Sequence, residues 1–97
     1  MDYEKPSLSG YTIYSKSGCI LCNKVKDYLK SNGRTFTSVD CDEYLIEDRD
    51  EFVGFIDSCA GKSTGGFPKV FLDGFFIGGF AETKNYKELT FDENADF

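Results

Sequence analysis

Two cysteines separated by two residues, Cys19 and Cys22, stand between a short apolar run and a segment with helical periodicity. The run Tyr11–Tyr14 is aromatic and β-branched, which is typical of a strand. After a loop of small residues, apolar side chains recur at helical spacing until Asn32-Gly33, a typical helix stop; these are Leu21, Val25, Tyr28 and Leu29. The cysteine pair is therefore expected where a first strand meets a first helix.

Three further patterns predict the middle of the chain. Thr35–Val39 is expected to be a second strand. Asp48 with Glu51 three residues later is typical of a capping box at the start of a helix. Behind it, one apolar face forms at i, i+3, i+4 and i+7, made of Phe52, Phe55, Ile56 and Cys59, and Gly61 is expected to end this helix.

The last third predicts a hairpin and a final helix. Asp73-Gly74 separates the apolar runs Val70–Leu72 and Phe75–Ile77, which is a strong hairpin signal. Ala81 to Leu89 is expected to be helical, with Tyr86 and Leu89 facing inward. The predicted order is β-α-β-α-β-β-α, an α/β fold with a mixed sheet.

The 97 residues fit one domain. We expect a flexible leader over residues 1–9, a folded domain over 10–89 and an acidic tail over 90–97.

Composition excludes several classes of function. The net charge is −6 and there is no histidine, so we expect no nucleic-acid binding and no histidine chemistry. No apolar stretch reaches the ~20 residues of a membrane span, and Met1–Pro6 does not resemble a signal peptide. We expect a cytoplasmic monomer that does not bind membranes.

The cysteines are the candidate reactive groups. At a helix amino end, unpaired N–H groups and the helix dipole stabilise an anion such as a thiolate. We therefore assign Cys19 as the attacking thiol and Cys22 as the resolving thiol. Two alternatives stay open: a zinc site completed by Cys41 and Cys59, or cysteines that only fill the core. We expect Cys41 and Cys59 to be structural.

Three motifs, in order, resemble the glutaredoxin family. Lys16-Ser17-Gly18-Cys19-Ile20-Leu21-Cys22 is similar to its active-site run. Phe67-Pro68-Lys69-Val70-Phe71 resembles its cis-proline segment, and Gly74–Phe80 resembles its glycine-rich segment. The resemblance covers Tyr11 to about Leu89. It implies a thioredoxin-like fold, a four-stranded mixed sheet flanked by three helices.

The resemblance also implies a glutathione site. Lys16 would stabilise the thiolate and contact the glycine carboxylate of glutathione. Pro68 would be cis, and the backbone of Phe67 would pair with the cysteinyl part. The segment after Gly79 would hold the γ-glutamyl end through the backbone of Ala81 and Glu82.

The chain departs from the family pattern at three places. Ile20-Leu21 replaces the usual Pro-Tyr between the cysteines. Gly65 stands where Arg or Gln is common, and Ala81 replaces an acidic or hydroxyl residue.

The implied function is that of a glutathione-dependent thiol-disulfide oxidoreductase acting on disulfide-bearing proteins and glutathione mixed disulfides. It has glutathione as co-substrate and needs no metal. One alternative is an iron–sulfur cluster module, in which Cys19 and glutathione would bind the cluster. Another is a thioredoxin-type reductant.

The acidic tail suggests a partner. Phe91 and Phe97 bracket acidic residues, and this pattern resembles the carboxy-terminal docking peptide of many ribonucleotide reductase small subunits. Such a segment would raise the local concentration of the protein at the large subunit. We therefore expect the large subunit of ribonucleotide reductase as a client that binds through Phe91–Phe97.

Overall fold

The computed structural model describes residues 2–86, and within them the predicted order of strands and helices is confirmed. The elements are β1 Tyr11–Ser15, α1 Ile20–Ser31, β2 Phe36–Asp40, α2 Asp42–Ala60, β3 Lys69–Leu72, β4 Phe75–Gly78 and α3 Phe80–Asn85. None of these helices is long and apolar enough to cross a membrane.

The four strands form one mixed sheet in the order β2-β1-β3-β4. β1 pairs parallel with β2, whereas β1–β3 and β3–β4 are antiparallel. Parallel neighbours end at the same edge of a sheet, so the segments after β1 and β2 meet. Their contact begins at once, because Cys41 N–H donates to the Ser15 carbonyl at 2.9 Å.

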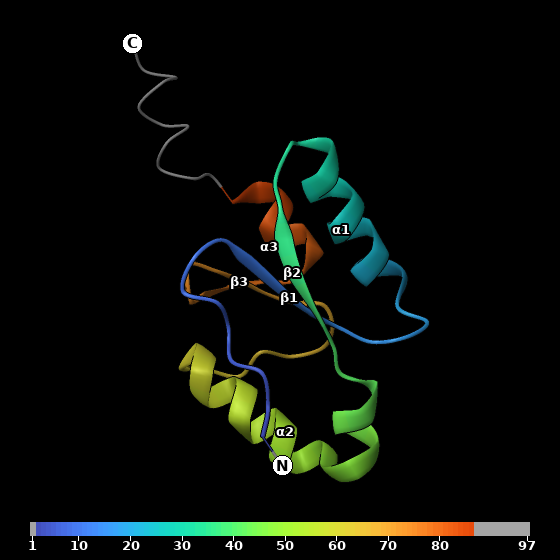
Figure 1. Cartoon of the computed structure of the whole chain (residues 1–97), viewed down its shortest axis with the longest axis vertical. Helices are drawn as coiled ribbons and strands as arrows, with labels where there is room; N and C mark the ends of the chain where they lie inside the picture. Colours follow the sequence, from blue (N-terminus) through green and yellow to red (C-terminus); the bar gives the residue numbers. More distant parts are fainter. Residues whose placement is uncertain (1, 87–97) are drawn as a thin grey trace.

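Helices cover both faces of the sheet. Figure 1 shows α1 and α3 together on one side and α2 on the other. Successive side chains of β1 alternate between the faces, so each face has its own buried cluster. The cluster under α2 contains Tyr14, Val39, Cys41, Phe52, Ile56 and Phe71. The cluster under α1 contains Tyr11, Ile13, Val25, Leu29 and Val70.

The predicted hairpin is confirmed at Asp73-Gly74. Both residues have positive φ, 52° and 88°, which is the conformation of a tight two-residue turn whose twist matches the strands. The Asp73 carboxylate also accepts the Gly10 N–H at 2.7 Å. The turn is thereby tied to the start of β1.

α2 is longer than predicted and bends at the predicted cap. It begins at Asp42, and Asp48 interrupts it with extended backbone. The Asp48 carboxylate accepts the Glu51 N–H at 3.0 Å, as an N-cap does. The Glu51 carboxylate takes the Tyr3 hydroxyl at 2.6 Å. The predicted cap therefore starts the second half of α2, and the sequence pattern missed the first half.

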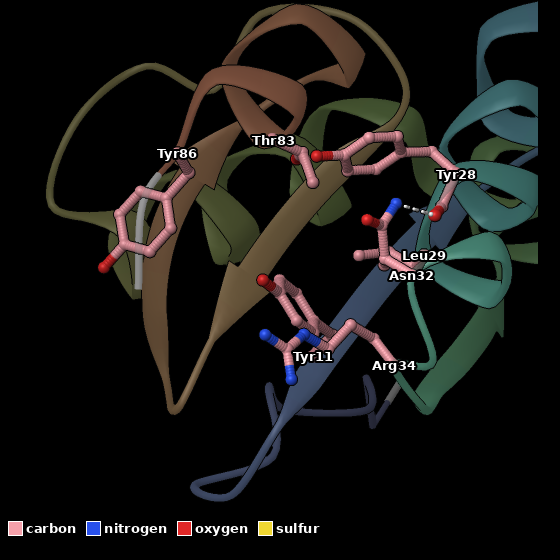
Figure 2. Close-up of a pocket in the computed structure, with 7 residues that line it drawn as sticks. All are labelled: Tyr11, Tyr28, Leu29, Asn32, Arg34, Thr83 and Tyr86. Carbon is pink, nitrogen blue, oxygen red and sulfur yellow. Dashed lines mark hydrogen bonds between the residues drawn. The ribbon is translucent and has the colours of Figure 1, made fainter. Parts of the chain in front are cut away.

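The last helix differs from the prediction. α3 begins one residue earlier than predicted and ends at Asn85, and Leu89 lies outside the described residues. Tyr86 is 44% exposed, so its predicted inward position is wrong. Thr83 is the buried side chain of this helix, at 2% exposure. Figure 2 shows Thr83 and Tyr86 around a cavity of about 20 Å³ between α1, β1 and α3, with Tyr86 at its outer edge.

The amino-terminal segment, expected to be flexible, packs along α2 (Figure 1). The Tyr3 ring contacts Tyr44, Phe52 and Phe55 with centroids 4.9, 5.4 and 5.1 Å away. The Glu4 carbonyl accepts the hydroxyl of buried Tyr14 at 2.7 Å. The segment therefore supplies one side of the cluster under α2.

We predict that Tyr3→Ala lowers the free energy of unfolding by about 1–3 kcal/mol, because three ring contacts and their buried area are lost. Tyr3→Phe should cost clearly less, since it removes only a hydroxyl contact at the surface. Urea unfolding followed by circular dichroism measures both. Equal midpoints for Tyr3→Ala and the wild type would contradict the structural role of this segment.

Candidate active site

Cys19 is the N-cap of α1. Its backbone is extended, and its Sγ accepts the Cys22 N–H at 3.2 Å. The residue is partly exposed. An amide N–H and the helix amino end both point at the sulfur, and each favours a negative charge there. This is the environment that a nucleophilic thiolate needs.

Cys22 lies one turn into α1 and is buried at 1% exposure. With Val25 and Leu29 it forms the buried stripe of the helix. Leu21, which the apolar pattern included in that stripe, is instead 46% exposed. Burial, and secondarily the hydrogen bond with Cys19, raise the pKa of Cys22 to about 11. Cys22 is therefore a protonated thiol at neutral pH.

The loop between β1 and α1 is tied to the start of α2. Ser17 donates its N–H to Asp42 at 2.9 Å, and its hydroxyl donates to the other oxygen of the same carboxylate. The Ser17 hydroxyl, then its N–H, lower the pKa of Asp42, and the charge of Lys16 acts in the same direction. Asp42 thus positions the residues that precede Cys19.

The Phe67-Pro68 peptide bond is cis, as the family resemblance implied. The Phe67 ring lies near two cations: Lys16 Nζ is 5.6 Å from its centroid and Lys69 Nζ is 4.8 Å from it. Both distances are within the range of cation–π attraction. The ring therefore connects the lysine before the cysteine pair to the strand after the cis proline.

The turn between β4 and α3 brings backbone close to side chain. Gly78 has a φ of 140°, and a Cβ there would lie 2.6 Å from Glu82 Cβ and Cγ. The Glu82 carboxylate accepts the Gly79 N–H at 2.8 Å. This bond is the main cause that lowers the pKa of Glu82. Glu82 therefore caps α3 in place of the side chain that Ala81 lacks.

An open cavity of about 270 Å³ gathers most of the predicted site residues. It is lined by Phe67, Pro68, Gly79, Ala81 and Glu82, all predicted, and by Leu21, Thr64, Gly66 and Phe80, which were not. Leu21 is two residues from Cys19, so the first turn of α1 forms one wall. Lys16 is exposed and lines a separate polar hollow of about 240 Å³ with Lys26 and Asp40.

Sequence reasoning missed Asp42 and Thr64. Asp42 follows the second predicted strand, and parallel pairing with the first strand brings it to the active-site loop. That pairing was the available signal. Thr64 had no signal, because its position depends on long-range contacts.

Cys41 and Cys59 lie away from the pair. Cys41 is fully buried beside Tyr14 in the cluster under α2, and burial raises its pKa to about 12. Cys59 packs at the edge of the same cluster. Within residues 2–86, no three Cys, Asp or Glu side chains form a group that would hold a metal ion. The four-cysteine zinc arrangement is therefore not formed.

Comparison with known proteins decides the family. The family model "Glutaredoxin" matches residues 11–77, which is more than half of the chain. The chain belongs to the glutaredoxin family. No curated protein sequence matches it significantly.

Solved glutaredoxin structures are similar over most of the chain. Glutaredoxin 1 from Francisella tularensis, complexed with cacodylate, has 25% identity and a TM-score of 0.67, covering 90% of this chain and 96% of that one. Reduced glutaredoxin C1 from Populus tremula x tremuloides has 27% identity and a TM-score of 0.65, covering 91% and 68%. The buckwheat glutaredoxin–glutathione complex has 26% identity and a TM-score of 0.60, covering 75% and 63%.

These similarities confirm the predicted thioredoxin-like fold of this glutaredoxin. Family and fold together make it a thiol-disulfide oxidoreductase. Its C-x-x-C pair, Cys19 and Cys22, is the dithiol of that chemistry.

We predict that Cys19 of the reduced protein is alkylated by iodoacetamide at pH 7 well before Cys22, because Cys19 is more exposed. Cys22 is buried and its pKa is about 11, so its rate should rise about tenfold per pH unit between pH 7 and 10 as thiolate forms. Peptide mass spectrometry after timed quenching gives both rates. Faster labelling of Cys22 than of Cys19 at pH 7 would contradict the assigned roles.

Proposed function

We propose that this glutaredoxin is a glutathione-dependent oxidoreductase that reduces protein disulfides and glutathione mixed disulfides. The observation that carries the proposal is the Cys19 sulfur at the amino end of α1, beside a cavity lined by the cis-proline and glycine-rich segments. The buckwheat relative, a glutaredoxin–glutathione complex, supports glutathione as the ligand.

The reaction starts at Cys19. Its thiolate attacks one sulfur of the substrate disulfide, a new S–S bond forms to Cys19, and the other sulfur leaves as a thiolate that takes a proton. With a glutathione mixed disulfide, Cys19 retains the glutathionyl group. A second glutathione thiolate attacks that sulfur, which releases oxidised glutathione and regenerates Cys19.

Cys22 acts on protein disulfides. After Cys19 has bonded to one protein sulfur, Cys22 loses its proton and attacks Cys19, which forms an intramolecular disulfide and frees the protein thiol. Two glutathione molecules then reduce the Cys19–Cys22 disulfide. The high pKa of Cys22 keeps this thiol protonated until it is needed.

The remaining residues would bind glutathione. Lys16 would attract the glycine carboxylate in a protein whose net charge is −6. The backbone of Phe67 beside Pro68 would pair with the cysteinyl part as an added strand does. The N–H groups of Ala81 and Glu82 would hold the γ-glutamyl carboxylate.

We predict that Cys19→Ser lowers the reduction of a glutathionylated peptide by glutathione at least about a thousandfold, because serine does not form the attacking thiolate. Cys22→Ser should keep activity within about threefold, since this substrate needs no resolving thiol. The assay follows oxidised glutathione through NADPH and glutathione reductase.

An inactive wild type would contradict the proposal. Reduction by a flavoprotein reductase would then favour the thioredoxin-type alternative. A coloured dimer after anaerobic purification would favour a cluster held by Cys19 and glutathione.

We also propose the large subunit of ribonucleotide reductase as a client. The acidic segment Phe91–Phe97, outside the described residues, carries this proposal through its resemblance to the small subunit's docking peptide. Removing it should weaken binding to the large subunit about tenfold or more, because the tethered contact is lost. Calorimetric titration measures the affinity. Unchanged binding, with reduction of the glutathionylated peptide also unchanged, would contradict the docking role alone.

A further inference from the structure

The lysine after the cis proline is buried, although it belongs to a strongly charged class of side chain. Lys69 is 1% exposed, and a buried ammonium is stable only when its protons are bonded. Its Nζ lies 2.8 Å from Thr64 Oγ1, 2.5 Å from the Gly65 carbonyl and 3.4 Å from the Gly66 carbonyl. Three acceptors match the three donors of an ammonium group.

All three acceptors belong to the loop that enters the cis proline. Thr64 and Gly66 line the active-site cavity, together with Phe67 and Pro68. Lys69 comes from β3, where it pairs with Tyr14 of β1. The ammonium therefore attaches a loop wall of the cavity to the central strands of the sheet.

A carboxylate on α2 completes the arrangement. The Thr64 hydroxyl accepts from Lys69 and donates to Asp57 Oδ1 at 2.7 Å, and Thr64 N–H donates to the same oxygen at 2.9 Å. These bonds lower the pKa of Asp57. Burial lowers the pKa of Lys69, and the charge of Asp57 acts against that shift. The hydroxyl thus links a buried cation to its counter-charge.

The same cation also contacts the ring that faces the catalytic loop. Lys69 Nζ lies 4.8 Å from the centroid of Phe67, whose ring is also 5.6 Å from Lys16 Nζ. Phe67 is the residue whose backbone is proposed to pair with glutathione. Both the backbone and the ring of this residue therefore depend on where Lys69 holds the loop.

We propose that Lys69, with Asp57 acting through Thr64, is the positioning residue that holds loop 64–67 in the conformation that binds glutathione. This rests on the proposed function. Gly65 carries no side chain that would order the loop from outside, so order comes from the buried ammonium beneath it. Lys69 does not touch the reacting sulfur atoms, and its effect is on binding rather than on the attack by Cys19.

The test compares Lys69→Met with Lys24→Met, which removes the same charge from an exposed position on α1. For Lys69→Met we expect KM for the glutathionylated peptide to rise about tenfold as preorganisation of the loop is lost. The kcat and the alkylation rate of Cys19 should stay within about twofold, because the thiolate environment is intact. Lys24→Met should change none of these.

A second pair of variants covers the case in which Lys69→Met does not fold. Asp57→Asn keeps the size of the side chain and lies outside the cavity lining, and Asp50→Asn is its exposed control on α2. Asp57→Asn should raise KM in the same direction by a smaller factor. Unchanged KM in both Asp57→Asn and a folded Lys69→Met, or a fall in kcat and Cys19 alkylation instead, would overturn the proposal.

A readout without glutathione separates this proposal from the proposed function. Amide hydrogen exchange at Gly65, Gly66 and Phe67 should be about tenfold faster in Lys69→Met, or in Asp57→Asn, than in the wild type. Faster exchange with an inactive wild type would keep the loop role and overturn its link to glutathione. Unchanged exchange in both variants would overturn the loop role itself.

Discussion

The parallel pairing of β1 with β2 is the contact on which the active-site geometry depends. It brings the ends of both strands to one edge of the sheet, so the loop before Cys19 meets the start of α2. Ser17 and Asp42 join the two segments there through hydrogen bonds. On the other side, β1 pairs with β3, whose first residue follows the cis proline. One strand therefore positions both the cysteine pair and the loop proposed to receive its substrate.

Local charges at the site differ in sign from the whole molecule. The chain carries a net charge of −6, yet the cysteine sulfur faces a helix amino end, and two lysines lie against the Phe67 ring. Asp42 and Asp57 do not oppose these groups directly. Each accepts N–H and O–H bonds from a loop, and those bonds order the backbone. The carboxylates near the site are therefore structural, and the positive potential stays at the sulfur.

The departures from the family pattern have structural counterparts. Ile20 and Leu21 are 71% and 46% exposed, so the residues between the cysteines present an apolar surface next to the reactive sulfur. Ala81 does not cap α3, but Glu82 reaches back to the Gly79 N–H instead. Gly65 has no side chain, and the Lys69 ammonium binds its carbonyl from within. The architecture of the site is kept by different bonds.

The sequence alone determined the features whose causes are local. The helix start at Cys19, the cap at Asp48 and the turn at Asp73-Gly74 each depend on residues within a few positions, and the three motifs fixed the family and fold. Tertiary structure decided the rest, because it brings distant segments together. Lys69, Asp42 and Tyr3 would each be exposed polar or terminal residues by pattern, and only their partners on other elements explain their positions. Tyr86 has an apolar ring at an inward helical position, but α3 ends at Asn85, so no further helical turn buries it.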